Sequence, residues 1–76
     1  MFVKVTSLGK DPLPKGTAHI NVDHILEMRQ LSKFTEIEYA RGGIIHVSES
    51  VEEILLDIYR QETRVLFHKE KKPEVF

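Results

Sequence analysis

The chain has 76 residues, with 11 basic and 12 acidic side chains, a formal net charge of −1 and no cysteine. This length allows one small domain that buries only about 60% of its chain surface, and the missing cysteines exclude disulfides. The net charge of −1 argues against a protein that coats nucleic acid without sequence preference. No apolar run reaches the roughly 20 residues that span a bilayer, so we expect a cytoplasmic protein without membrane insertion.

Two alternating segments near the start predict the first strands of a sheet. Residues 2–8 and 17–22 place apolar and polar side chains on opposite faces. Their apolar positions, which we expect to face the core, are Val3, Val5, Ala18, Ile20 and Val22. Two prolines between the strands predict a loop, because proline lacks the donor for a strand ladder. Leu13, between these prolines, is either a partner contact or a loop residue packed back on the sheet.

The next segment predicts a turn followed by a strand. Asn21 and Asp23 are expected to bend the chain by bonding the local backbone. His19 lies roughly 13 Å from Asp23 on an extended strand, which is too far for both to bind one metal ion. Residues 25–31 predict the strand, although their apolar spacing of three also suits a short helical turn. The residues expected to be buried there are Ile25, Met28 and Leu31.

Residues 35–39 and 44–47 predict a hairpin. Its apolar positions are Ile37, Tyr39, Ile45 and Val47. A two-residue connection would place the apolar positions of one strand opposite the polar positions of the other, whereas three residues bring the apolar positions together. We therefore predict a three-residue connection, with Gly42 or Gly43 in the left-handed region that glycine adopts without steric cost.

On the opposite face of this hairpin, the same register brings Glu36 and Glu38 near His46. No nucleophile accompanies the histidine, so we interpret His46 as half of a surface pair and not as a catalytic base. The sequence offers no catalytic set and no cofactor or metal site. We expect a protein that is not an enzyme.

A capping box from Ser50 to Glu53 predicts a helix that runs to about Gln61, with Ser48 as a competing cap. The apolar stripe expected to cover the sheet consists of Val51, Ile54, Leu55 and Ile58. The predicted fold is α+β: residues 1–67 form one domain, an antiparallel sheet of four to five short strands covered on one face by a single C-terminal helix. Residues 68–76 are expected to form a charged tail.

The segment after this helix carries two candidate contact sets. The apolar triplet Val65, Leu66 and Phe67 either completes the core or contacts a protein partner or a second copy of the chain, because oligomerisation commonly stabilises so small a core. The basic residues alternate with acidic ones and form either an ordinary solvated surface or a nucleic-acid site. They are Arg60, Arg64, Lys69, Lys71 and Lys72.

Several segments together resemble the small flagellar protein family called FlbD or SwrD. They are the strand Val3–Leu8, Asn21-Val-Asp-His-Ile25, Thr35-Glu-Ile-Glu-Tyr-Ala-Arg-Gly42 and Val47-Ser-Glu-Ser-Val-Glu-Glu-Ile54. The family's Asn-Gly turn is Arg41-Gly42 here, and the loop at 9–16 is longer. The resemblance implies a bacterial cytoplasmic accessory protein of motility that acts by contact, as an interaction adaptor.

A second resemblance is to the first half of LytTR-type DNA-binding domains. It rests on the order of strands, hairpin and helix, and on Val65-Leu-Phe-His-Lys69, which is similar to part of their basic segment. The chain stops before the full domain. This resemblance implies the alternative function, a small nucleic-acid-binding regulator of transcription or translation.

Overall fold

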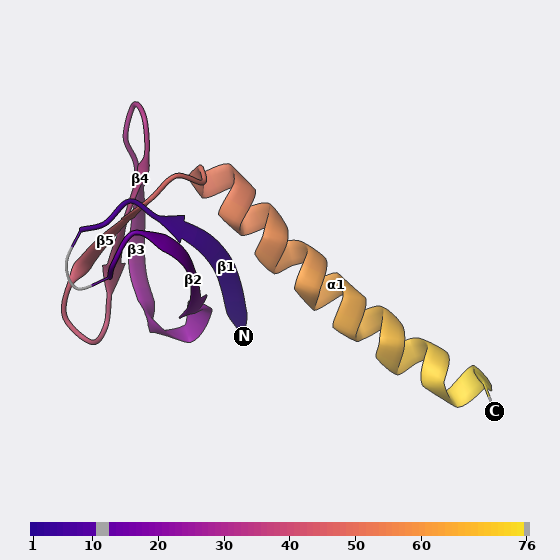
Figure 1. Ribbon diagram of the computed structural model, residues 1–76. Coiled ribbons are helices and arrows are strands. Elements are labelled where there is room, and N and C mark those ends of the chain that lie inside the picture. Colours follow the sequence, from indigo (N-terminus) through magenta and orange to yellow (C-terminus); the bar gives the residue numbers. More distant parts are fainter. Residues whose placement is uncertain (11–12, 76) are drawn as a thin grey trace.

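A computed structural model describes the backbone of residues 1–10 and 13–75 and the side chains as far as Thr63. Five strands form one antiparallel sheet in the order β2-β1-β5-β4-β3, and a single helix follows them (Figure 1). The elements are β1 (Phe2–Ser7), β2 (Gly16–Asn21), β3 (Ile25–Gln30), β4 (Thr35–Tyr39), β5 (Ile44–Val47) and α1 (Val51–Val75). The predicted α+β class, with a small antiparallel sheet and one C-terminal helix, is confirmed.

The two edge strands of the sheet, β2 and β3, are joined by a short 3₁₀ helix at Val22–His24. The Asn21 Oδ1 atom accepts a hydrogen bond from the Asp23 amide at 3.0 Å, so the predicted backbone-bonded turn is confirmed for Asn21. The Tyr39 hydroxyl accepts a second bond from the Asn21 amide at 2.7 Å. This bond connects the end of β2 to β4, although the two strands are not neighbours in the sheet.

The β4–β5 hairpin has the predicted register. Ile37 lies opposite Ile45, and the Tyr39 amide donates to the Gly43 carbonyl at 3.0 Å, so residues 40–42 form the connection. Gly42 has a φ of +85° and Gly43 a φ of +140°, which confirms the need for glycine here. The apolar positions of both strands consequently face the core.

The core lies between the curved sheet and the first turns of α1. Its buried apolar residues are Val3, Val5, Ile20, Ile37, Ile45, Val47 and Ile54, and Ala18, Ile25 and Met28 pack against them. The prediction that Leu31 is buried was wrong, because its side chain is 39% exposed. Leu31 follows the last residue of β3, and its amide donates to the Phe34 carbonyl in the turn to β4.

Helix α1 begins with the predicted capping box. The Ser50 hydroxyl accepts from the Glu53 amide at 3.0 Å, and the Glu53 carboxylate accepts from the Ser50 amide at 2.8 Å. Ser48 instead donates its amide to the Thr6 carbonyl of β1. The Gln30 side chain accepts from the Val51 amide at 2.8 Å, which attaches the first helical residue to the end of β3.

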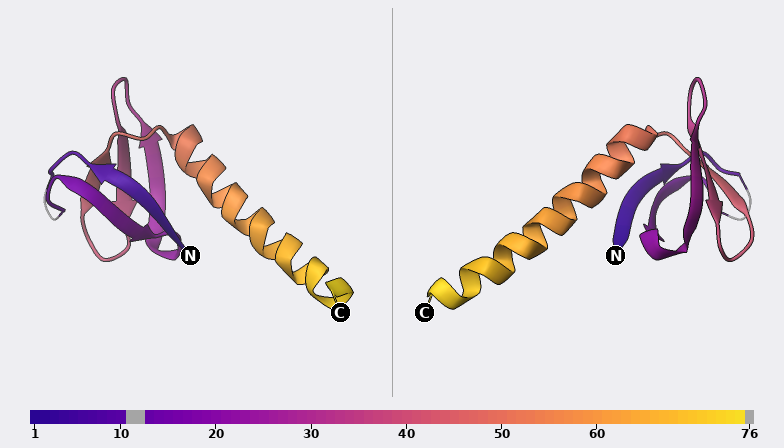
Figure 2. Two further views of the ribbon diagram at one scale, coloured as in Figure 1. Left: turned by 45° about the vertical axis from the view of Figure 1, so that its right-hand side comes forward. Right: turned by 180° about the vertical axis from the view of Figure 1, so that it is seen from behind.

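Two expectations for the helix were wrong. It continues beyond Gln61 to Val75, because no glycine or asparagine cap interrupts residues 62–72, which are rich in helix-forming charged side chains. Leu55 is 51% exposed and does not cover the sheet, whereas Ile54 is only 2% exposed. The sheet covers only the part of the helix surface that carries Ile54 and Ile58. Further along, the helix extends away from the sheet (Figure 2).

Candidate interaction surfaces

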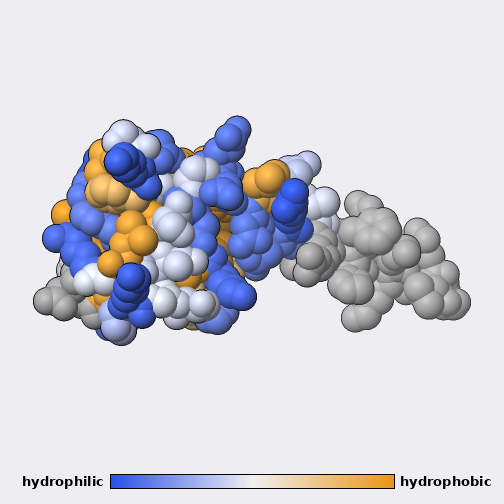
Figure 3. Space-filling view, turned by 45° about the horizontal axis from the view of Figure 1, so that its top comes forward, coloured by the Kyte–Doolittle hydropathy of each residue, from blue (hydrophilic) through white to orange (hydrophobic). Residues whose placement is uncertain are grey.

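The first turns of α1 expose three large apolar side chains. Leu55, Leu56 and Tyr59 are 51%, 44% and 64% exposed. Leu55 and Tyr59 are four residues apart and therefore neighbours on the helix surface. We call these three residues the α1 apolar surface. Apolar atoms are visible at the molecular surface where the helix leaves the sheet, among hydrophilic residues (Figure 3). The apolar arc of the helix is thus wider than the part that the sheet covers.

A groove of about 310 Å³ lies between α1 and β1. Its lining residues are Val3, Lys4, Glu49, Glu53, Ile54, Leu56, Asp57 and Arg60. Arg60 is the only predicted nucleic-acid contact whose side chain the structure describes, and it shares this groove with Lys4 and three carboxylates. Acidic side chains therefore outnumber basic ones among the described lining residues, which disfavours phosphate groups. The assignment of Arg60 as a nucleic-acid contact stays a prediction.

The remaining predicted contacts on the helix lie beyond the described side chains. The backbone of each is part of α1. They are the apolar Val65, Leu66 and Phe67 and the basic Arg64, Lys69, Lys71 and Lys72. Their assignments as partner or nucleic-acid contacts stay predictions.

Leu13 packs against the core from the loop before β2, which confirms the interpretation that it packs back on the sheet. Its assignment as a partner contact stays a prediction. It also lines a pocket of about 410 Å³, which we call the β2-edge pocket. The other lining residues are His19, Ile20, Tyr39, Arg41, Gly42, Gly43 and Ile45. Among the described lining residues are two side chains that can carry positive charge and none that is acidic.

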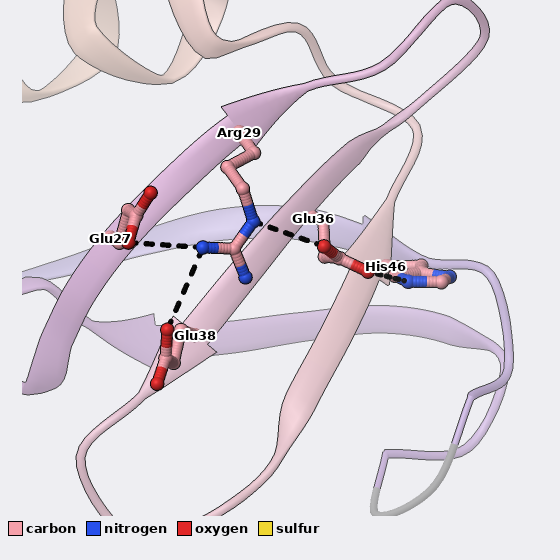
Figure 4. A network of polar contacts seen from close by, with 5 residues as sticks. All are labelled: Glu27, Arg29, Glu36, Glu38 and His46. Carbon is pink, nitrogen blue, oxygen red and sulfur yellow. Dashed lines mark hydrogen bonds and ion pairs between the residues drawn. The ribbon is translucent and has the colours of Figure 1, made fainter.

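The outer face of β3, β4 and β5 carries a polar network (Figure 4). The predicted pair is present: His46 Nε2 lies 2.9 Å from Glu36 Oε2. The other Glu36 oxygen accepts from Arg29 Nε at 3.1 Å, and Arg29 Nη1 lies 3.0 Å from Glu27 and 3.6 Å from Glu38. The hydrogen bond from His46, followed by that from Arg29, lowers the pKa of Glu36.

Arg29 was not predicted to belong to this network. Its position opposite Glu36 follows from the β3–β4 register, which the uncertain strand assignment of residues 25–31 left open. The hydrogen bonds that Arg29 donates to Glu36 and then to Glu27 raise the pKa of its guanidinium above the usual value. A cation already bound by three carboxylates orients neighbouring strands, and His46 has no nucleophile among its polar contacts here. The network therefore links β3, β4 and β5 and favours their observed register.

Among the described residues, no three or more potential metal-ligating side chains form a group, and no helix has the length and hydropathy needed to cross a membrane. Comparison with known proteins found no matching family model, curated protein or solved structure.

Proposed function

We propose that this protein is a non-catalytic interaction adaptor that binds a protein partner through the α1 apolar surface. The observation that carries the proposal is the exposure of Leu55, Leu56 and Tyr59 on a helix whose neighbouring residue, Ile54, is buried in the core. Large exposed apolar side chains grouped on one element are typical of protein contact sites. The resemblance to the FlbD or SwrD family supports a partner in bacterial flagellar function.

The attachment of α1 supports this function. Its first turn is held by the capping box, by the Gln30–Val51 bond and by Ile54 in the core. Further along, the Gln61 side chain donates to the Phe2 carbonyl at 3.0 Å. The contact residues therefore sit on a section of helix fixed to the sheet, and little conformational entropy is lost when they bind.

Photo-crosslinking in the cell tests this proposal. A photoreactive phenylalanine analogue replaces Tyr59 in one variant and the exposed Lys33 of the β3–β4 turn in the other. We expect a defined crosslinked product from position 59, and its loss when Leu55→Ser and Leu56→Ser are added. Equal crosslinking from both positions, or a product that survives the two serine substitutions, would refute the proposed surface.

Glu52→Ser is the matched control, because Glu52 is exposed on the same turn and the substitution has a similar effect on helix propensity. Circular dichroism should show that all variants stay folded. The flagellar part of the proposal has its own test. Leu55→Ser/Leu56→Ser should reduce swimming motility at unchanged protein level, and full motility in a strain lacking the gene would exclude that role while leaving the crosslinking result standing.

A further inference from the structure

The backbone groups of β2 alternate between a paired side and an open side. The Val22 amide donates to the Met1 carbonyl of the β1 side, whereas the Asn21 amide points away and donates to the Tyr39 hydroxyl. In an antiparallel pair these directions alternate along the strand. Hence Ala18 and Ile20 direct their N–H and C=O groups toward β1, and Thr17 and His19 direct theirs to the outside.

This outer side of β2 is accessible. The side chains of Thr17 and His19 are exposed, and within the described chain neither amide donates to another segment. An open strand edge presents a ready-made pattern of donors and acceptors for another extended segment. The Tyr39 hydroxyl occupies the position at Asn21, so the free part of the edge ends there.

The β2-edge pocket lies beside this free edge. Leu13, Ile20 and Ile45 give it apolar walls, and Gly42 and Gly43 line it without side chains. Its volume of about 410 Å³ falls within the usual range for ligand pockets, roughly 300–1,000 Å³. Arg41, at the tip of the hairpin, adds a positive charge at the mouth.

We propose that β2 is a docking edge for an extended peptide segment of a partner protein, with one large apolar side chain in the β2-edge pocket and a carboxylate near Arg41. Hydrogen bonds from the segment to Thr17 and His19 would add a sixth strand to the sheet, the recognition mode known as β-augmentation. The pocket selects the apolar side chain, and the cationic mouth selects an acidic neighbour. The carboxylate comes from a side chain or from a chain terminus.

This site is separate from the α1 apolar surface. The β2-edge pocket has no α1 residue among its described lining residues, and the β4–β5 connection that lines it lies on the side of the sheet away from α1 (Figures 1 and 2). The proposal therefore goes beyond the function proposed for the helix, and either can fail without the other. Together the two sites would allow one adaptor to hold two partners.

Peptide titration followed by amide NMR tests this proposal on the full chain. The main probe is acetyl-Thr-Leu-Thr-Glu-amide, and acetyl-Thr-Leu-Thr with a free carboxyl terminus tests the alternative source of the carboxylate. We expect saturable shifts and slowed hydrogen exchange at the amides of Thr17 and His19. The amides of Ala18 and Ile20, which already face β1, serve as internal controls and should change little.

The charge contact is tested by replacing glutamate in the probe with glutamine, and by Arg41→Glu in the protein. Because an exposed ion pair contributes little, we expect each change to weaken binding by about 3- to 10-fold. Lys33→Glu makes the same charge change in another turn and should have no such effect. Absence of saturable binding by both acidic probes, binding without exchange protection at Thr17 and His19, or equal effects of the two charge reversals would overturn the proposal.

Discussion

The contrast between Ile54 and Leu55 gives a quantitative test of how α1 meets the sheet. These neighbours are similar in size, but Ile54 is 2% exposed and Leu55 is 51% exposed. Removing a buried isoleucine side chain to its β-carbon typically costs about 2–5 kcal/mol, because the lost transfer energy adds to the energy of the cavity left behind. Ile54→Ala should therefore lower the free energy of unfolding by about 3 kcal/mol. Leu55→Ala should cost less than about 1 kcal/mol, since alanine also favours the helix.

Urea denaturation followed by circular dichroism measures both variants. For a domain of this size the loss in Ile54→Ala corresponds to a fall in melting temperature of about 12–24 °C, because each kcal/mol lowers it by about 4–8 °C. A marginally stable domain could lose most of its folded population at 37 °C. If Leu55→Ala destabilises the protein as much as Ile54→Ala, the sheet must cover a different face of the helix from the one described.

Three further changes test individual contacts. Glu36→Gln should reduce the loss of stability at low pH. His46 and Arg29 hold the pKa of Glu36 below the usual value of a glutamate, so the contribution of Glu36 to stability is present above that usual value and is lost as the pH falls through the lower folded-state pKa. Urea midpoints at pH 7 and pH 3, with Glu52→Gln as the control, measure this. Gly42→Ala should cost about 1–2 kcal/mol in urea denaturation through backbone conformation alone. Its φ is +85°, and apart from the two neighbouring residues no atom of the described residues lies within 4 Å of an added β-carbon. No loss of stability would contradict the turn geometry. Ser50→Ala should lower stability by about 1 kcal/mol in the same assay, and a neutral result would show that the capping box does not hold the helix start.

Short-range chemistry explains what the sequence predicted well. The hairpin register followed from matching apolar faces, and the capping box followed from two residues three apart. Both depend on local geometry that a few side chains determine. The same reasoning placed His46 beside Glu36, because residues opposite each other on a hairpin must meet.

Longer-range arrangement explains what the sequence predicted poorly. An apolar stripe shows which helix face could be buried but not how much of that face the sheet covers. Leu55 was therefore assigned to the core, although only the part of the face with Ile54 and Ile58 meets the sheet. The β2-edge pocket likewise brings together Leu13, β2 and the tip of the β4–β5 hairpin. That meeting depends on β5 returning to pair with β1, which no local pattern in the chain encodes.

Two glutamines determine how mechanical load would pass through this molecule. Gln30 holds the amide of Val51, and Gln61 holds the carbonyl of Phe2, so the helix is pinned at two points ten residues, or about 15 Å, apart. The helix continues beyond Gln61 to Val75, so a force on that last part would act on β1 through the Gln61 contact. A pull on that part would strain the Gln61 bond before it reached the hairpin, and the amino terminus would be the first part of the sheet to yield.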